Sequence, residues 1–171
     1  IGEGIDLDEK LNRIGSHIEV KFKKPGQESR IAEGFVTASL IFVIGAMAVV
    51  GALDSGLRGD HGILYTKSII DGFVALVLTT TMGFGVVFSA IPVVLYEGGI
   101  ALFATQINNW LPQDILDLFI EDMTSTGGLL IFAIGLNLLK ITDIRVANLL
   151  PSLVTVGFIL YIYTQVQQLF S

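Results

Sequence analysis

Residues 68–107 read SIIDGFVALVLTTTMGFGVVFSAIPVVLYEGGIALFATQI, and this nearly unbroken apolar run decides the fold. A helix needs about 20 apolar residues to cross a bilayer. The run is therefore long enough for two crossings, and we expect a tight turn between them near Ser89 to Pro92. Its only charges are Asp71 and Glu97. An ionisable group at membrane depth is costly, so these two acids are the first candidates for a functional role.

The composition of the whole chain is also that of a membrane protein. Of its 171 residues, 52% are hydrophobic and only 15% are charged, whereas soluble domains carry about 25% charged residues. The mean hydropathy is +0.72. Cysteine is absent, which excludes disulfides and thiolate metal sites. The chain begins with Ile1 and has no signal-peptide pattern, so we expect it to be N-terminally incomplete.

The hydrophobic pattern predicts an all-α, polytopic bundle of transmembrane helices. We expect about five of them, at about 34–53, 67–89, 91–108, 124–139 and 146–166. The first is followed by the polar loop DSGLRGDHG, and the third by an acidic loop that ends near Met123. The hexapeptide LIFVIG at 40–45 returns as LIFAIG at 130–135. These helices would cross in opposite directions, as in the inverted repeats of transporters, although six apolar residues could also match by chance.

Residues 1–33 form a polar segment ahead of the membrane helices. Apolar residues recur there at helical spacing, which predicts an amphipathic helix: Leu7, Leu11, Ile14, Ile18 and Phe22. Six of the ten basic residues lie in this segment: Lys10, Arg13, Lys21, Lys23, Lys24 and Arg30. A basic, amphipathic helix suits a lipid surface, with Lys21, Lys23 and Lys24 as the lipid-contacting residues. The alternative is that the helix packs on the protein itself.

The positive-inside rule gives an orientation to the bundle. The basic N-terminal segment belongs in the cytoplasm, and so does the loop 140–145 after the fourth helix. Trp110, Tyr65, Tyr161 and Tyr163 would then lie near the outer interface, as an aromatic belt does. The sequence therefore predicts a multi-pass protein of the inner (plasma) membrane.

The strongest candidate site is Glu97 with Gly98 and Gly99. A carboxylate at membrane depth needs a partner, water or a proton. The two glycines permit a close backbone approach or an unwound turn with free carbonyls, and carboxylate and carbonyl oxygens suit a monovalent cation or a proton. The alternative is a protonated or paired structural Glu. Asp71 follows Lys67 by four residues, so it either pairs with that lysine near the outer surface or lines a vestibule leading to Glu97.

Two asparagines complete the candidate ion- or solute-binding set. Asn137 and Asn148 lie in apolar helices, where lipid offers no hydrogen bond, so they either contribute to the site or join helices. Thr79, Thr80 and Thr81 either line a path or bond back to their own helix. We find no catalytic triad, phosphate-binding loop, metal motif or dinucleotide fingerprint, and nothing that resembles a nucleic-acid surface. We therefore expect no enzyme, no metal and no cofactor.

Three long blocks carry a family resemblance. They are GFVTASLIFVIGAMAVVGALDSGLRGDHGILYTKSIIDG, GFGVVFSAIPVVLYEGG and GGLLIFAIGLNLLKITDIRVANLLPS. Together they resemble the bacterial inner-membrane family called domain of unknown function 554, and the resemblance covers essentially the whole chain. It implies further hydrophobic segments upstream of Ile1. It implies no activity.

The sequence favours a small transporter or channel for an ion or small solute, because polar groups and helix breaks gather at membrane depth. The rival hypothesis is a non-transporting scaffold or sensor that binds lipid or a partner protein through its basic N-terminal helix. The expected partners are the lipid bilayer, a monovalent cation or proton, and further copies of the chain in a homo-oligomer.

Overall fold

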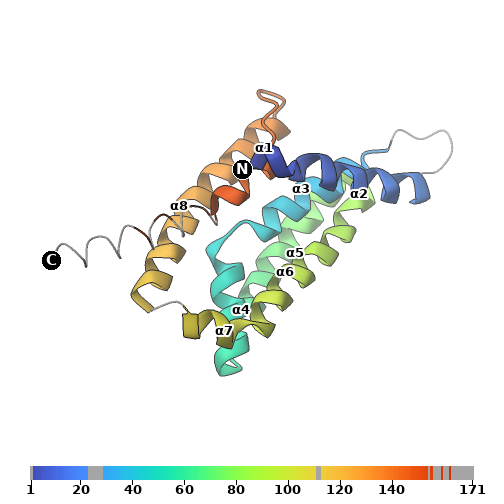
Figure 1. The fold of residues 1–171 in the computed structure, drawn as a ribbon. Helices are drawn as coiled ribbons and strands as arrows, with labels where there is room; N and C mark the ends of the chain where they lie inside the picture. Colours follow the sequence, from blue (N-terminus) through green and yellow to red (C-terminus); the bar gives the residue numbers. More distant parts are fainter. Residues whose placement is uncertain are drawn as a thin grey trace.

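The computed structural model describes residues 2–22, 29–110 and 113–153, together with residues 155, 159 and 162. Within these ranges the regular elements are all helical (Figure 1), which confirms the predicted all-α fold. In chain order they are α1 (Gly2–Ile5), α2 (Leu7–Phe22), α3 (Ile31–Val43), α4 (Ala46–Arg58), α5 (Gly62–Met82), the 3₁₀ helix η1 (Gly83–Ser89), α6 (Ala90–Leu102), α7 (Ala104–Trp110), α8 (Gln113–Leu138) and α9 (Val146–Leu149).

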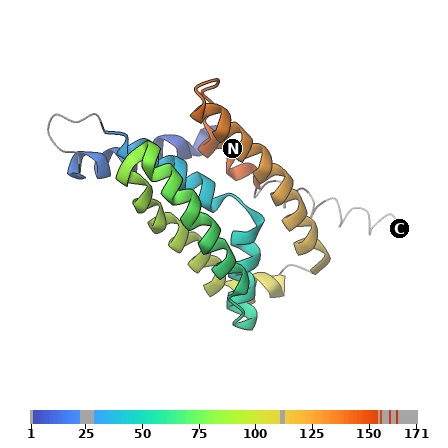
Figure 2. The same ribbon diagram turned by 180° about the vertical axis from the view of Figure 1, so that it is seen from behind.

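The apolar run forms an antiparallel hairpin in which α5 and α6 lie side by side (Figures 1 and 2). The chain reverses at Gly83, not near Ser89 to Pro92 as predicted. Gly83 has φ 77° and ψ −165°, a conformation that only glycine adopts at little cost. Pro92 was mistaken for the breaker, but it lies in the first turn of α6, where proline is tolerated.

The first predicted membrane helix, 34–53, is broken in two. α3 ends at Val43, Gly45 takes φ 153° and ψ 144°, and α4 begins at Ala46. The two helices are bent by 63° relative to each other. α4 then continues to Arg58 and ends at Gly59, whose left-handed φ of 67° is a common way for a helix to stop. Half of the predicted polar loop at 54–62 is therefore helical.

The acidic loop predicted before Met123 is also helical, because α8 begins at Gln113. Apolar residues at helical spacing explain this difference: Ile115, Leu116, Phe119, Ile120 and Met123. Ile115, Leu116 and Met123 are buried, while Asp117 and Glu121 are exposed on the other side. The acidic residues belong to the solvent-facing side of an amphipathic helical start rather than to a loop.

Two helical segments of the described chain are long and apolar enough to cross a membrane, 62–102 and 115–138, and the bent pair α3–α4 would make a third. The prediction of about five is therefore too high for these residues. One reason is that 62–102 is one of these two segments although it folds back on itself at Gly83 and so has two legs. Another is that most of the predicted helix at 146–166 lies outside the described residues, as do Tyr161 and Tyr163.

The hairpin is held by the two halves of the broken helix. At one end α3 crosses η1, where a Cβ added to Gly85 would lie 2.0 Å from the carbonyl oxygen of Ile31. At the other end α4 crosses α6, where a Cβ added to Gly56 would lie 2.2 Å from the carbonyl oxygen of Ala101. Both crossings require glycine, because any side chain would meet backbone.

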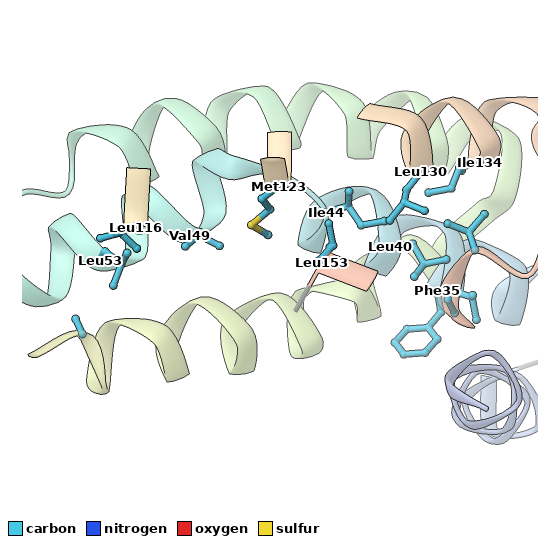
Figure 3. Close-up of a cluster of buried hydrophobic side chains, with 14 residues drawn as sticks. Phe35, Leu40, Ile44, Val49, Leu53, Leu116, Met123, Leu130, Ile134 and Leu153 are labelled. Carbon is cyan, nitrogen blue, oxygen red and sulfur yellow. The ribbon is translucent and has the colours of Figure 1, made fainter. Parts of the chain in front are cut away.

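The larger hydrophobic cluster runs along α3, α4 and α8 (Figure 3). It contains equivalent residues of both hexapeptides, Leu40 and Ile44 from the first and Leu130 and Ile134 from the second. The two hexapeptides nevertheless differ in backbone, because the first ends in the break at Gly45 while α8 continues through the second to Leu138. The inverted repeat stays a prediction.

α2 matches the predicted amphipathic helix and lies across one end of the bundle (Figure 1). Leu7, Leu11 and Ile18 pack against the larger cluster, and the Phe22 ring centroid lies 5.0 Å from that of Phe88 in η1. The apolar side of this helix is therefore partly engaged with the protein itself, while Ile14 and Phe22 remain about half exposed. Of the predicted lipid-contacting lysines, Lys21 is exposed, and Lys23 and Lys24 lie outside the described residues.

Candidate functional site

The centre of the hairpin's open end is a buried lysine between two acids. Lys67 and Asp71 lie four residues apart on α5 and form an ion pair. Glu97 reaches the same lysine from α6, with 3.1 Å between Lys67 Nζ and Glu97 Oε1. The exposed fractions of the three side chains are 9%, 26% and 17%. We call Lys67, Asp71 and Glu97 the charged trio.

Of the two readings of Glu97, this arrangement favours the paired one, with Lys67 as its partner, and it does not place Glu97 deeper than Asp71. Because Lys67 contacts both acids, the three side chains lie at one level of the hairpin. A rise of 1.5 Å per residue places Lys67 and Asp71 roughly 7 to 14 Å from the start of α5. The trio therefore lies well inside the apolar hairpin, on the far side from the reversal at Gly83.

A groove of about 330 Å³ holds the trio. Most of its wall is apolar and comes from α3, α5, η1 and α6: Phe42, Leu64, Ala75, Val86, Val87, Ala90 and Val93. The trio carries two negative charges and one positive charge, so its net charge is −1 when all three groups are ionised. Glu97 Oε1 is buried, and its partner among the described residues is the Lys67 ammonium, which it shares with Asp71. One ammonium for two carboxylates leaves one negative charge uncompensated, which is costly in an apolar wall.

The glycines beside Glu97 do not serve the packing of the described chain. Gly98 and Gly99 lie within α6 and keep its helical backbone, and Phe103 N–H donates to the Gly99 carbonyl at 3.1 Å. No atom lies within 4 Å of a Cβ added at either position. Their carbonyls are therefore not exposed by unwinding, and their small surface is open.

Asn137 lies away from the trio and organises the loop that follows α8. Its side-chain amide donates to the Ile144 carbonyl at 2.7 Å, and its oxygen accepts from the Thr142 hydroxyl at 2.8 Å and from Ile144 N–H at 2.9 Å. These bonds occupy both ends of the Asn137 amide. It also lines a polar cavity of about 470 Å³ between α2, α3 and α8.

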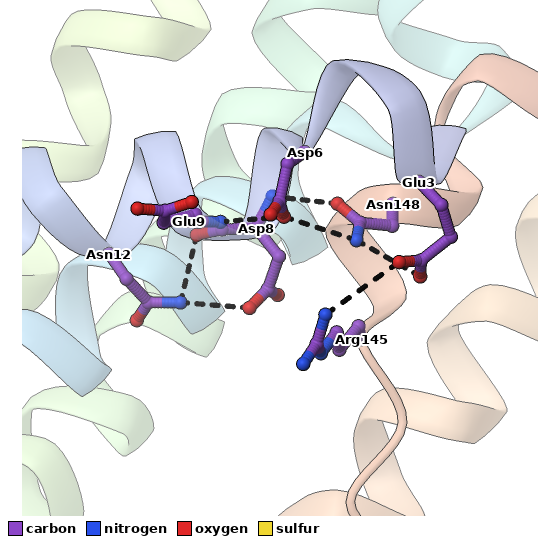
Figure 4. Close-up of polar contacts among 7 residues, drawn as sticks. All are labelled: Glu3, Asp6, Asp8, Glu9, Asn12, Arg145 and Asn148. Atoms are coloured by element: carbon purple, nitrogen blue, oxygen red, sulfur yellow. Dashed lines mark hydrogen bonds and ion pairs between the residues drawn. The ribbon is translucent and has the colours of Figure 1, made fainter. Parts of the chain in front are cut away.

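Asn148 is buried and ties α9 to the N-terminal helices (Figure 4). Its oxygen accepts from Asp8 N–H at 2.9 Å, and its amide nitrogen lies 3.2 Å from Glu3 Oε1 and 3.3 Å from Asp6 Oδ1. Arg145 adds an ion pair to Glu3 at 3.7 Å. We call these contacts the Asn148 latch. They place the N-terminal segment and the loop 140–145 at the same end of the molecule.

The pKa values of two acids at the latch, Asp6 and Asp8, are shifted in opposite directions. The hydrogen bond from Asn148 is the main cause that holds the pKa of Asp6 below its ordinary value of 3.8. Burial is the main cause that raises the pKa of Asp8 above the same value. Asp6 therefore favours the latch when it is charged, and Asp8 favours it when it is neutral.

The remaining polar candidates form hydrogen bonds with residues close to them in the sequence. The hydroxyls of Thr79, Thr80 and Thr81 donate to carbonyls three or four residues earlier on α5. His61 pairs with Ser55 near the start of that helix. Among the described residues no three side chains of metal-binding type lie close enough to hold an ion.

The sequence reasoning missed that Lys67 joins the two acids. The sequence does contain a signal for this contact, because Lys67 and Glu97 are separated from the MGFG segment, which contains Gly83, by nearly equal numbers of residues. A hairpin that reverses there brings them to one level, whereas a turn near Pro92 does not.

Comparison with known proteins finds relatives without an assigned activity. The family described as "Protein of unknown function (DUF554)" matches residues 1–161. The "Uncharacterized membrane protein YdfK" of Bacillus subtilis is 33% identical over 95% of this chain, and the "Uncharacterized protein YqgA" of Escherichia coli is 33% identical over 90%. The chain spans 66% and 65% of the length of these relatives. No solved structure matches it significantly.

Proposed function

The chain belongs to the DUF554 family, in which the relative YdfK is named a membrane protein, and we propose that it is a small transporter or channel for an ion or small solute. One observation carries the proposal: the charged trio, with two acids and one base, lies in the wall of an apolar hairpin. Ionisable groups at such positions usually mark substrate or ion pathways.

The energetic argument is that stability alone does not account for the trio. A buried ion pair is often no more stable than well-packed apolar side chains of similar volume. The trio also keeps one negative charge in excess, and an apolar wall solvates such a charge poorly. A bound cation or proton would neutralise that charge, and a polar solute could donate a hydrogen bond to it. The groove volume of about 330 Å³ is at the small end of ligand pockets, which favours a small substrate.

The bilayer and further copies of the chain are the partners that this proposal involves. None of the 13 residues of α6 is buried, and the outward side chains of the hairpin are large and apolar, with Phe73, Leu95 and Leu102 at least 63% exposed. Such a surface suits lipid or another copy. We place the protein in the inner membrane as a multi-pass, homo-oligomeric protein with no enzymatic activity.

The rival function is a scaffold or sensor that binds lipid or a partner protein through α2. The burial of Leu7, Leu11 and Ile18 against the core leaves α2 with less apolar surface for such contacts. Lys21 remains exposed. This rival predicts that Lys21→Glu weakens binding to anionic vesicles while Glu97→Leu has no effect on function.

Flux through reconstituted liposomes tests the transport proposal. Wild type, Glu97→Ala and the control Asp117→Asn, which removes an exposed carboxylate from α8, are assayed with H⁺, Na⁺, K⁺ and common anions. We expect wild type and Asp117→Asn to conduct at least one of these ions at similar rates, and Glu97→Ala to be at least tenfold slower. Equal flux in wild type and Glu97→Ala for every ion would end the proposal.

A further inference from the structure

We propose that the charged trio binds one monovalent cation in exchange for one proton, with Lys67 as a built-in counter-ion. This inference rests on the proposed transport function and names its substrate class. It follows from the charges that the fold brings together: Asp71 and Glu97 on either side of one ammonium.

The net charge selects the ligand. With all three groups ionised the trio carries −1, and an apolar wall favours a neutral site because uncompensated charge is poorly solvated there. One proton or one monovalent cation brings the total to zero. A divalent cation would leave +1 and an anion would make −2. The neutral trio with a proton and the neutral trio with a cation are therefore the two favoured states, and each excludes the other.

The oxygens of the groove suit such a cation. Glu97 Oε1 contacts the Lys67 ammonium but accepts no hydrogen bond from the described residues, and the two carboxylates present oxygen ligands of the hard type that alkali cations prefer. Ser68 and Ser89 also line the groove. Their hydroxyl protons are donated to backbone carbonyls of their own segments, so the hydroxyl oxygens keep lone pairs for a ligand.

Few other titratable groups face Glu97. Lys67 and Asp71 come from α5, and Tyr96 is its neighbour on α6. The parts of α3 and η1 that line the groove contribute only Phe42, Val86, Val87 and Ser89, none of which titrates. The proton that the cation displaces therefore comes from the two carboxylates. In the balanced exchange the cation enters the protonated trio and one proton leaves to solvent.

Proton release from purified protein tests this exchange without requiring transport. The protein in detergent, weakly buffered and mixed with a pH-sensitive dye, receives NaCl, KCl or LiCl, and choline chloride at equal ionic strength serves as the control salt. We expect about one proton per chain at saturation with at least one alkali cation and none with choline. The apparent cation affinity should fall about tenfold for each pH unit of acidification while the exchange operates.

Charge-matched variants separate this exchange from a structural role. Asp71→Asn and Glu97→Gln each leave a neutral trio, and we expect each to abolish proton release. The double variant of Lys67→Gln with Glu97→Gln restores a net charge of −1 on Asp71, and we expect it to recover cation-dependent release. Asp117→Asn should match wild type. Gel filtration and thermal unfolding check that each variant is folded.

The outcomes are distinct. No proton release from wild type with any alkali cation overturns the inference, as does full release from folded Glu97→Gln. Flux without proton release leaves the transport proposal standing and overturns only the exchange. Proton release without flux supports the cation site and overturns transport.

Discussion

The crossing of α3 and η1 allows a quantitative prediction for Gly85→Ala. The added Cβ would lie 2.0 Å from the carbonyl oxygen of Ile31 and 2.7 Å from the Cα of the same residue. Ordinary contacts begin at 3.4 Å. The two backbones must therefore separate by about 1.4 Å, and no flexible side chain is available to yield in their place.

The expected cost follows from the behaviour of overpacked interiors. Forcing an extra methyl group into a packed contact costs about 1–3 kcal/mol. In a chain of this size 1 kcal/mol corresponds to roughly 2–4 °C in the unfolding midpoint. Gly85→Ala should therefore lower the midpoint by roughly 2–12 °C.

Gly98→Ala is the matched control, because nothing lies within 4 Å of its added Cβ and alanine favours a helix by about 0.5–1 kcal/mol over glycine. We expect its midpoint to rise by roughly 1–4 °C. Both variants are compared with wild type by thermal unfolding in the same detergent. If Gly85→Ala unfolds at or above the midpoint of Gly98→Ala, the close crossing of α3 and η1 is wrong.

Three further predictions concern the latch and the core. Asn148→Ala leaves the Asp8 N–H without its acceptor, so we expect a loss of about 1–3 kcal/mol and faster amide exchange in α1 and α2; unchanged exchange would contradict the latch. The pKa of Asp6 is lowered in the folded state, so its contribution is present above pH 3.8 and is lost as the pH falls below that value. The raised pKa of Asp8 has the opposite effect on stability, so the Asp6 contribution is measured by comparing wild type with Asn148→Ala. We expect acid to speed amide exchange in α1 and α2 of wild type but not of Asn148→Ala. Equal acid sensitivity in both proteins would refute the Asp6 contribution. In the core, Leu130→Ala should cost about 2–5 kcal/mol and Leu129→Ala, which is 71% exposed, about 0.5 kcal/mol or less, as measured by denaturant or thermal unfolding.

The sequence was sufficient to predict elements in which one periodic pattern dominates. The helical spacing of the apolar residues from Leu7 to Phe22 predicted the helix that the structure shows as α2, and the apolar run predicted the hairpin. The site of reversal was not predictable from composition, because Pro92 and Gly83 are both breakers and only the tertiary fold decides between them. α3 packs against η1 through Gly85, and this contact requires the turn to precede η1.

The break at Gly45 has a similar explanation. LIFVIG breaks and LIFAIG does not, so the residues that the two hexapeptides share do not decide the break. Ile44, next to the break, packs against α8, where a Cβ added to Gly127 would lie 3.2 Å from its side chain. The pair of Lys67 with Asp71 was among the predictions, but the addition of Glu97 was not, since bringing Lys67 to Glu97 depends on the position of the reversal.

The broken helix also has a mechanical consequence. α3 packs against the reversing end of the hairpin at Gly85, and α4 packs against the charged end at Gly56. Both contacts are made by backbone against backbone. Phe42, three residues before the break, forms part of the wall of the groove. Because neither contact leaves room for the helices to slide, the hairpin fixes α3 and α4 relative to each other across the break at Gly45. The bend at Gly45 and the wall of the groove around Lys67 are therefore held in place by the same two contacts.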